Sequence, residues 1–180
     1  EALPHLHALA QSTGERVNLG ILHREQVLYL AGVEKPSLPT IYTRFGKTVP
    51  ANCSSLGKAI LAFMRDSEVM AILQARPLVA LTPNSITDLP RLLEDLEATR
   101  RRGYATDTEE AAPGTHCIGA TIFDAANQPV GAISITGPSP KAPGPDVLPL
   151  VEMLNEACGH VSRRLGFRGT WPAAAGEAKQ

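Results

Sequence analysis

The sequence predicts an α+β domain built on an antiparallel sheet. Two extended segments joined by a short connection come early, helical segments fill the middle, and further extended segments precede a long closing helix. This order groups strands apart from helices and lacks the strand–helix–strand alternation of a doubly wound parallel sheet. The 180 residues are 43% hydrophobic and 19% charged, which suits one folded domain with a substantial core.

The chain opens on a helical pattern followed by a predicted hairpin. Leu3, Leu6 and Leu9 recur at helical spacing over residues 1–11, and Gly14 follows as a stop signal. Because this pattern starts at residue 1 without a cap or an initiator methionine, we expect the helix to continue a segment upstream. The extended segments expected next are 17–22 and 27–33, paired as a hairpin, and then 40–45.

Three helices are expected in the middle of the chain, at 52–64, 66–74 and 89–102. At the start of the first, Asn52, Ser54 and Ser55 are candidate caps. The third is the clearest, because leucines recur along it at i, i+3, i+4 and i+7. Asp88 is expected to cap its start and Gly103 to end it.

The last third of the chain returns to strands and ends in a helix. The expected strands are 104–108, 115–123 and 130–136, and the closing helix covers 150–165 with Gly166 as its stop. Between them, the proline-rich segment 138–145 is expected to be a loop. The domain is therefore expected to span 15–167, preceded by the helix end at 1–14 and followed by a disordered tail at 168–180.

Charge and cysteine content exclude several functional classes. The net charge is −1 and the pI about 6.6, so this chain lacks the basic surface of a nucleic-acid-binding domain. Arg100, Arg101 and Arg102 fall in the last turn of an expected helix, where cations complement the dipole. The chain contains neither a membrane-length apolar run nor a leader pattern, and its three cysteines indicate a reducing cytoplasm.

Gly57 and Lys58 form the Gly-Lys pair of a phosphate-binding loop, but the flanking residues do not fit that motif. The motif needs a glycine at position 52, which is Asn52, and a hydroxyl residue at position 59, which is Ala59. What remains is a helix start whose free N–H groups and positive dipole end can accept an anion. Simple helix capping explains the same residues, and is the interpretation we favour from this segment alone.

Alternation along the two late strands predicts a polar sheet face. Thr115, Cys117, Gly119 and Thr121 share one face of the first strand, and Ser134 and Thr136 share one face of the second. The opposite face is aliphatic. Beside a helix start, a face of hydroxyls, a thiol and glycine could line a small-molecule pocket. Exposure to solvent explains the pattern equally well.

Other reactive residues give weaker signals. Asp107, Glu109 and Glu110 could supply an acid and a base, although a local acidic run is more typical of a solvated turn. Cys158 lies on the apolar stripe of the last helix and is expected to be a buried structural thiol. Since no metal-ligand spacing occurs, we expect neither a metal nor a cofactor.

Several segments, taken together and in register, resemble the effector-binding domain of the isocitrate lyase regulator (IclR) family of bacterial transcription factors. The matching segments are 12–19, 50–62, 102–117 and 132–138. The match runs from about residue 2 to residue 167, and several motifs in order are far more specific than any one of them.

The resemblance implies a curved antiparallel sheet with flanking helices, related to GAF and PAS sensor domains. It also implies homodimers or dimers of dimers, and operator DNA bound only through an N-terminal winged helix-turn-helix that this chain lacks. Carried over position by position, the effector, expected to be a small organic acid, would contact Ile41, Ser54, Ser55, Leu56, Asp107, Thr115, Cys117, Ser134 and Thr136. Relatives often have a smaller residue at Leu56, so this side chain is expected to narrow the pocket or make it more apolar.

The function expected on these grounds is therefore that of a regulatory domain, not an enzyme. The alternative from another class is a GAF-like redox enzyme that uses Cys117 as its nucleophile, with Asp107 or Glu109 nearby. The sequence disfavours it, because the chain shows neither a resolving cysteine close to Cys117 nor a base paired with its thiol.

Overall fold

The computed structural model describes residues 1–34, 45–137 and 147–170. Its strands are β1 (Arg16–His23), β2 (Gln26–Val33), β3 (Thr48–Pro50), β4 (Ala105–Thr108), β5 (His116–Phe123) and β6 (Pro129–Gly137). Its helices are α1 (Leu3–Thr13), α2 (Ser55–Phe63), α3 (Asp66–Gln74), α4 (Leu89–Arg102) and α5 (Leu148–Arg164), with a short 3₁₀ helix, η1 (Ala51–Cys53), before α2.

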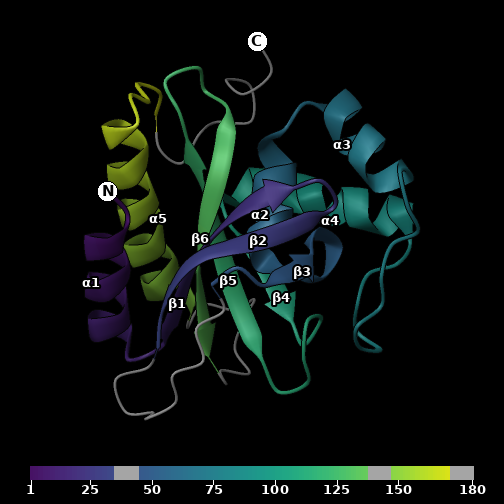
Figure 1. The fold of residues 1–180 in the computed structure, drawn as a ribbon, viewed down its shortest axis with the longest axis horizontal. Helices are drawn as coiled ribbons and strands as arrows, with labels where there is room; N and C mark the ends of the chain where they lie inside the picture. The colour runs from purple at the N-terminus through teal and green to yellow at the C-terminus, as the bar shows by residue number, and fades with distance from the viewer. Residues whose placement is uncertain (35–44, 138–146, 171–180) are drawn as a thin grey trace.

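The strands form one six-stranded sheet in the order β3-β2-β1-β6-β5-β4, and neighbouring strands are antiparallel. The sheet is curved, with α1 and α5 side by side on one of its faces and α2, α3 and α4 grouped on the other (Figure 1). The predicted fold class, α+β with a curved antiparallel sheet and flanking helices, is confirmed.

Most of the expected elements are present at the expected places. The β1–β2 hairpin closes through Arg24 and Glu25, with Arg24 in the left-handed region at a φ of 57°. The carboxylate of Asp88 accepts the N–H of Arg91 and caps α4, which ends at Gly103 with a φ of 83°. Arg100, near the end of α4, donates a hydrogen bond to the carbonyl of Ala62. This contact links α4 to α2 and agrees with a structural role for this arginine.

Four expectations need correction or fall outside the described residues. The strand predicted at 40–45 lies almost wholly outside the described residues, among which β3 is the strand that pairs with the free edge of β2. The helix predicted at 52–64 begins only at Ser55, because η1 occupies the preceding turn. The predicted loop at 138–145, and most of the predicted tail, also lie outside the described residues.

Helix α2 is the central packing element on its side of the sheet. All nine of its residues are buried, as expected for a helix that is apolar on almost every side. Glycines permit this close approach. A Cβ at Gly119 of β5 would lie 2.6 Å from the carbonyl oxygen of Ser55, and one at Gly57 would lie 2.4 Å from that of Ala51.

The two faces of the sheet belong to two separate cores. Ile118, Ile133 and Ile135 pack with Leu154 and Val161 of α5 on one side. The other core joins α2 and α4 to residues of the sheet's second face, including Val27, Tyr29 and Ala132. The alternation predicted along β5 and β6 is therefore confirmed: their aliphatic positions point to α1 and α5, and their small and polar positions point to α2.

Candidate functional site

The polar positions of three neighbouring strands form one row on the α2 side of the sheet. Asp107 of β4 lies opposite Cys117 of β5, and Cys117 lies opposite Thr136 of β6. Ser134 occupies the next position of the same face and lies opposite Gly119. Residues separated by up to 29 positions in the sequence are thus brought to one patch by strand pairing alone.

The start of α2 lies directly above this patch. Because Gly119 has no side chain, the backbone of Ser55 lies close to β5 at the start of α2. Ser54 is the N-cap residue, but its side chain forms no capping hydrogen bond. Because an α-helix leaves its first N–H groups without intrahelical partners, those of Ser55 and Leu56 face the patch without a capping side chain from the described residues.

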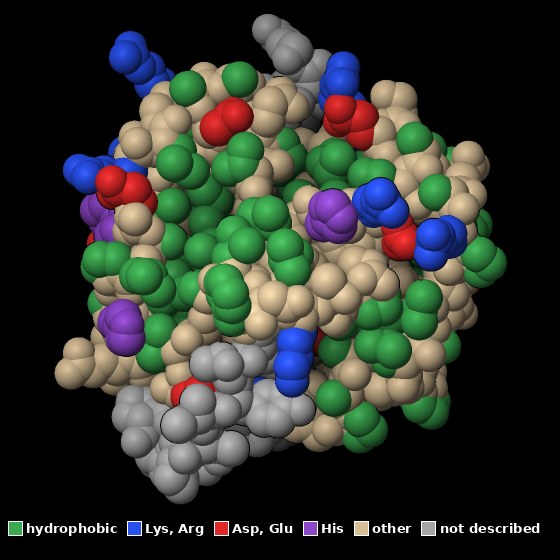
Figure 2. All heavy atoms as spheres, viewed as in Figure 1, with side chains coloured by type: hydrophobic (Ala, Val, Ile, Leu, Met, Phe, Trp, Pro, Cys, Tyr) green, Lys and Arg blue, Asp and Glu red, His purple; other side chains and the backbone are tan. Residues whose placement is uncertain are grey.

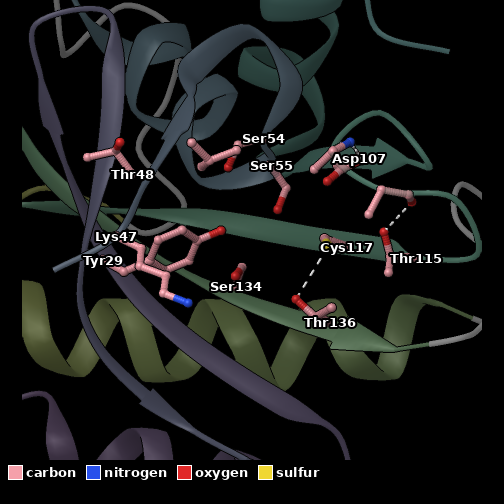
Figure 3. A pocket seen from close by; sticks show the side chains of 13 residues that line it. Tyr29, Lys47, Thr48, Ser54, Ser55, Asp107, Thr115, Cys117, Ser134 and Thr136 are labelled. Atoms are coloured by element: carbon pink, nitrogen blue, oxygen red, sulfur yellow. Dashed lines mark hydrogen bonds between the residues drawn. The ribbon is translucent and has the colours of Figure 1, made fainter. Parts of the chain in front are cut away.

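Between the patch and the helix start is a cavity of about 180 Å³. Figure 3 shows Ser54 and Ser55 on the α2 side, Ser134 and Thr136 across from them, and Tyr29 and Lys47 at a third side. The full lining is Tyr29, Lys47, Thr48, Val49, Ser54, Ser55, Asp107, Ala111, Ala112, Thr115, Cys117, Ser134 and Thr136. The walls therefore offer hydroxyl groups, a thiol, an ammonium group and a carboxylate around a small space.

Asp107 is the buried carboxylate of this wall, with only 2% of its surface exposed. Its Oδ1 accepts the N–H of Glu110 at 2.8 Å and that of Ala111 at 3.3 Å, which fixes the turn after β4. Burial raises the pKa of Asp107, and the two N–H donors and the nearby Lys58 ammonium oppose that rise only in part.

Several hydroxyl groups of the pocket already have partners within the protein. The Cys117 thiol and the Thr136 hydroxyl are 3.3 Å apart, and Thr136 also accepts the side-chain amide of Asn18 at 3.3 Å. Thr115 donates to the carbonyl of Ala112 at 2.6 Å. These bonds orient the polar groups of the wall and hold the turn that carries Ala112.

The acidic run after β4 is not the solvated turn that we favoured from the sequence. Glu110 is 6% exposed, and its Oε1 accepts a hydrogen bond from the buried Nζ of Lys58 at 2.7 Å. The same Nζ lies 2.9 Å from Oδ2 of Asp95 in α4. Only Glu109 keeps a substantially exposed side chain. The local sequence gave no sign of this pairing because the lysine lies 52 positions earlier.

The structure brings together most, but not all, of the predicted site residues. Seven of the nine line the cavity: Ser54, Ser55, Asp107, Thr115, Cys117, Ser134 and Thr136. Leu56 does not line it, because its side chain is fully buried in the core and points toward Gly20 of β1. The expectation that Leu56 narrows the pocket is therefore wrong for its side chain. Ile41 lies outside the described residues.

Sequence reasoning missed the wall formed by β2 and β3. Tyr29 shares a face of β2 with Val27, so the alternation applied to the late strands would have placed it on the α2 side as well. Lys47 and Thr48 gave no comparable signal, since they lie beside a strand of three residues with no pattern of its own.

The remaining chemistry of the described residues is limited. Among them, no group of three or more His, Cys, Asp or Glu side chains is placed to hold a metal ion. Within the same part of the chain, no helix is both long and apolar enough to cross a membrane. Cys53 and Cys158 are fully buried, and burial raises the pKa of Cys158 to about 12, so neither can serve readily as a resolving thiol for Cys117.

Comparisons with known proteins identify the same family across most of the chain. A family model described as the C-terminal domain of the bacterial transcriptional regulator IclR matches residues 1–163. The HTH-type transcriptional repressor AllR of Escherichia coli K12 is 32% identical over 165 residues, which are 92% of this chain and 61% of AllR. The HTH-type transcriptional regulator BhcR of Paracoccus denitrificans is 39% identical over 138 residues, 77% of this chain and 50% of BhcR.

A solved structure gives the same result for the fold. The crystal structure of Thermotoga maritima IclR matches with a TM-score of 0.85 and 35% identity, covering 92% of this chain and 67% of that one. The chain therefore spans about three fifths of the length of AllR and half that of BhcR. None of these comparisons supports the alternative of a cysteine redox enzyme.

Proposed function

Because the chain belongs to the IclR family of bacterial transcriptional regulators, we propose that it is the effector-binding domain of such a regulator and senses a small organic acid. The observation that carries the proposal is the uncapped start of α2, directed at a cavity lined with hydrogen-bonding side chains. A helix N-terminus binds a carboxylate through free N–H groups and its positive dipole end, without needing a basic side chain.

The ligand's carboxylate would accept the N–H groups of Ser55 and Leu56, while Ser134 and Thr136 would hydrogen-bond its other end. Ser54 N already donates to the carbonyl of Ala51 at 3.4 Å, so the anion site begins one residue later than the serine pair suggests. Asp107 would accept from a ligand hydroxyl with the carboxylate oxygen that does not hold the turn. Ile41 would supply apolar contact.

The cavity's size favours a compact ligand. Pockets for drug-sized molecules measure roughly 300–1,000 Å³, whereas this one is about 180 Å³. A keto, hydroxy or small aromatic acid suits this volume, and its polar substituents would meet the hydroxyl-lined sheet face. A large hydrophobic ligand would find too few apolar walls here.

Regulation would follow from a preference of the effector for one arrangement of the sheet and α2. A coupling of roughly 1–3 kcal/mol between ligand and DNA is enough for such control. Operator DNA would be bound by a winged helix-turn-helix outside this chain, consistent with the chain's net charge of −1. The regulator would act in the cytoplasm as a homodimer or a dimer of dimers.

The direct test is a thermal-shift measurement with pyruvate, lactate, glycolate and benzoate, each compared with its amide. A ligand present at about 100 times its dissociation constant stabilises the folded state by about 2.7 kcal/mol. We expect stabilisation by at least one of the acids and a much smaller shift with the matching amide. Equal shifts with acid and amide would contradict the anion site at α2.

A variant at the helix start sharpens this test. Ser54→Asp places a carboxylate at the N-cap, where aspartate is itself a favourable cap. We expect the ligand-free melting temperature to stay the same or rise, while the acid-dependent shift disappears because the new charge occupies the anion site. Ser54→Asn, which caps without a charge, is the matched control. Retention of the full acid-dependent shift in Ser54→Asp would place the anion elsewhere.

A further inference from the structure

Lys58 is the one lysine or arginine side chain that is buried among the described residues, and its place in α2 is otherwise apolar. It is 1% exposed, with its Nζ 2.7 Å from Glu110 Oε1 and 2.9 Å from Asp95 Oδ2. Lysine is almost never buried unless paired, and a well-packed apolar residue is often as stabilising as a buried ion pair. Stability alone therefore does not account for a lysine at this position.

The residues that Lys58 holds belong to the pocket wall. Glu110 lies in the turn that connects β4 to β5, and the same turn supplies Ala111 and Ala112 to the cavity, while Asp107 lines it from the end of β4. The Glu110 N–H is bonded to Asp107 and the Glu110 carbonyl accepts the Ser85 hydroxyl at 2.8 Å. A displacement of Glu110 would therefore move Asp107 and the alanine wall together.

The conformation of this turn needs external support. Glu109 adopts a φ of 58°, in the left-handed region that residues other than glycine adopt only at a cost. Thr82 accordingly donates to the Glu109 carbonyl at 2.6 Å from outside the turn. Ser85 and Thr82 thus hold the backbone of the turn, and the Lys58 ammonium tethers it through the side chain of Glu110.

The local charges make this tether depend on a single cation. Three carboxylates, Asp95, Asp107 and Glu110, lie around the Lys58 ammonium. Asp95 forms a second ion pair, with its Oδ1 3.7 Å from a guanidinium nitrogen of Arg102. Among the described residues, Glu110 is paired with Lys58. Glu110 Oε2 is buried and makes no hydrogen bond there. Without Lys58, burial and repulsion from Asp107 would both disfavour a charged Glu110 side chain at this position.

We propose that Lys58 is a positioning residue of the pocket: its buried ammonium binds the β4–β5 turn to α2 and thereby holds Asp107, Ala111 and Ala112 in the pocket wall. The inference rests on the proposed function in taking this cavity as the ligand site. Lys58 does not line the cavity itself and acts through Glu110.

The test uses Cys117 as a reporter in the ligand-free protein. Cys117 lies opposite Asp107 in the sheet and lines the cavity, whereas Cys158 is fully buried in the core on the other face. Lys58→Met replaces the lysine with an unbranched side chain of similar length and removes its charge. We expect iodoacetamide to label Cys117 about tenfold faster in this variant, by local opening of the wall, with little change at Cys158. Amide hydrogen exchange should accelerate at Glu110 and Ala111 and remain slow at Ile133.

A purely structural role would give a different pattern. Leu154→Ala, in the opposite core, destabilises the domain without touching the turn, and should raise the labelling of Cys117 and Cys158 together. The same joint rise in Lys58→Met, or an unchanged Cys117 rate, would overturn the proposal. If Lys58→Met does not fold, Glu110→Gln removes the same ion pair with little change in shape. It should accelerate Cys117 labelling in the same direction, and an unchanged rate would be equally decisive. Since no effector is added, failure here is distinct from failure of the acid screen.

Discussion

The two faces of the sheet share one alternating pattern but are closed by different kinds of contact. Beneath α1 and α5 the buried side chains are almost all aliphatic, as Ile133, Ile135 and Leu154 illustrate. Beneath α2, the described part of the chain buries three charged side chains, those of Lys58, Asp107 and Glu110. An aliphatic face is stable when its volumes fit, whereas a polar face is stable only when each group meets its partner. The first face therefore serves stability, and the second has the features of a binding site.

The largest effect is expected on the aliphatic face. Leu154 is fully buried, and Leu154→Ala leaves a cavity beneath α5. Large-to-small substitutions of this kind cost about 2–5 kcal/mol, and urea unfolding would measure the loss. Leu148→Ala, on the same helix but 51% exposed, is the matched control and should stay within about 0.5 kcal/mol of the wild type. Comparable losses in the two variants would show that α5 is not packed as described.

A smaller effect is expected where α2 meets the polar face. A Cβ at Gly119 would lie 2.6 Å from the Ser55 carbonyl oxygen, a backbone atom that cannot rotate away. Gly119→Ala should therefore displace the start of α2 and cost about 1–3 kcal/mol, the range for overpacking. It should also weaken the carboxylate-dependent thermal shift, because the N–H groups of Ser55 and Leu56 would move.

Gly32→Ala is the control for this substitution, since its new Cβ would meet a side-chain atom, Oδ1 of Asn18, at 3.2 Å. That side chain can adjust, so the loss should be clearly smaller. An unchanged acid response in Gly119→Ala would mean that the helix start does not bind the anion, whatever the stability change.

The comparison also shows how far the sequence alone could lead. Alternation placed Cys117, Ser134 and Thr136 on one face and the isoleucines on the other, because the period of a strand is visible locally. Helix α3 was predicted with its observed bounds, and α4 with its cap and stop, because those signals are local as well. The candidate site could therefore be outlined before any contact was known.

The parts that were missed depend on contacts between distant segments. The pairing of Lys58 with Glu110 spans 52 positions, so the acidic run looked like a solvated turn. The side chain of Leu56 turns into the core because α2 is buried on all sides, a fact that no periodicity within nine residues reveals. Alternation puts Tyr29 on the same face of β2 as Val27, but the strand order that brings this face to the pocket could not be predicted from the spacing of the strands.

The smallest effect is expected at Asp107, and it should have the opposite sign. Asp107→Asn keeps the Oδ1 that accepts the N–H groups of Glu110 and Ala111 and removes a buried charge. Burial raises the pKa of Asp107 in the folded state above its ordinary value of 3.8, so the folded protein binds more protons than the unfolded chain between that value and the raised one. The contribution of Asp107 to the free energy of unfolding is therefore present at low pH and is lost as the pH rises through the raised pKa.

At neutral pH we accordingly expect Asp107→Asn to raise the melting temperature by roughly 2–4 °C, the shift of a 1 kcal/mol effect in a domain of this length. The gain should shrink as the pH falls toward about 4. Asp107→Ala is the control: it removes the same charge but leaves the N–H of Glu110 without its acceptor, so it should destabilise at every pH. If the asparagine variant is also less stable at pH 7, the ionised carboxylate contributes favourably to the fold. The polar face would then be held by its charges as firmly as the aliphatic face is held by its packing.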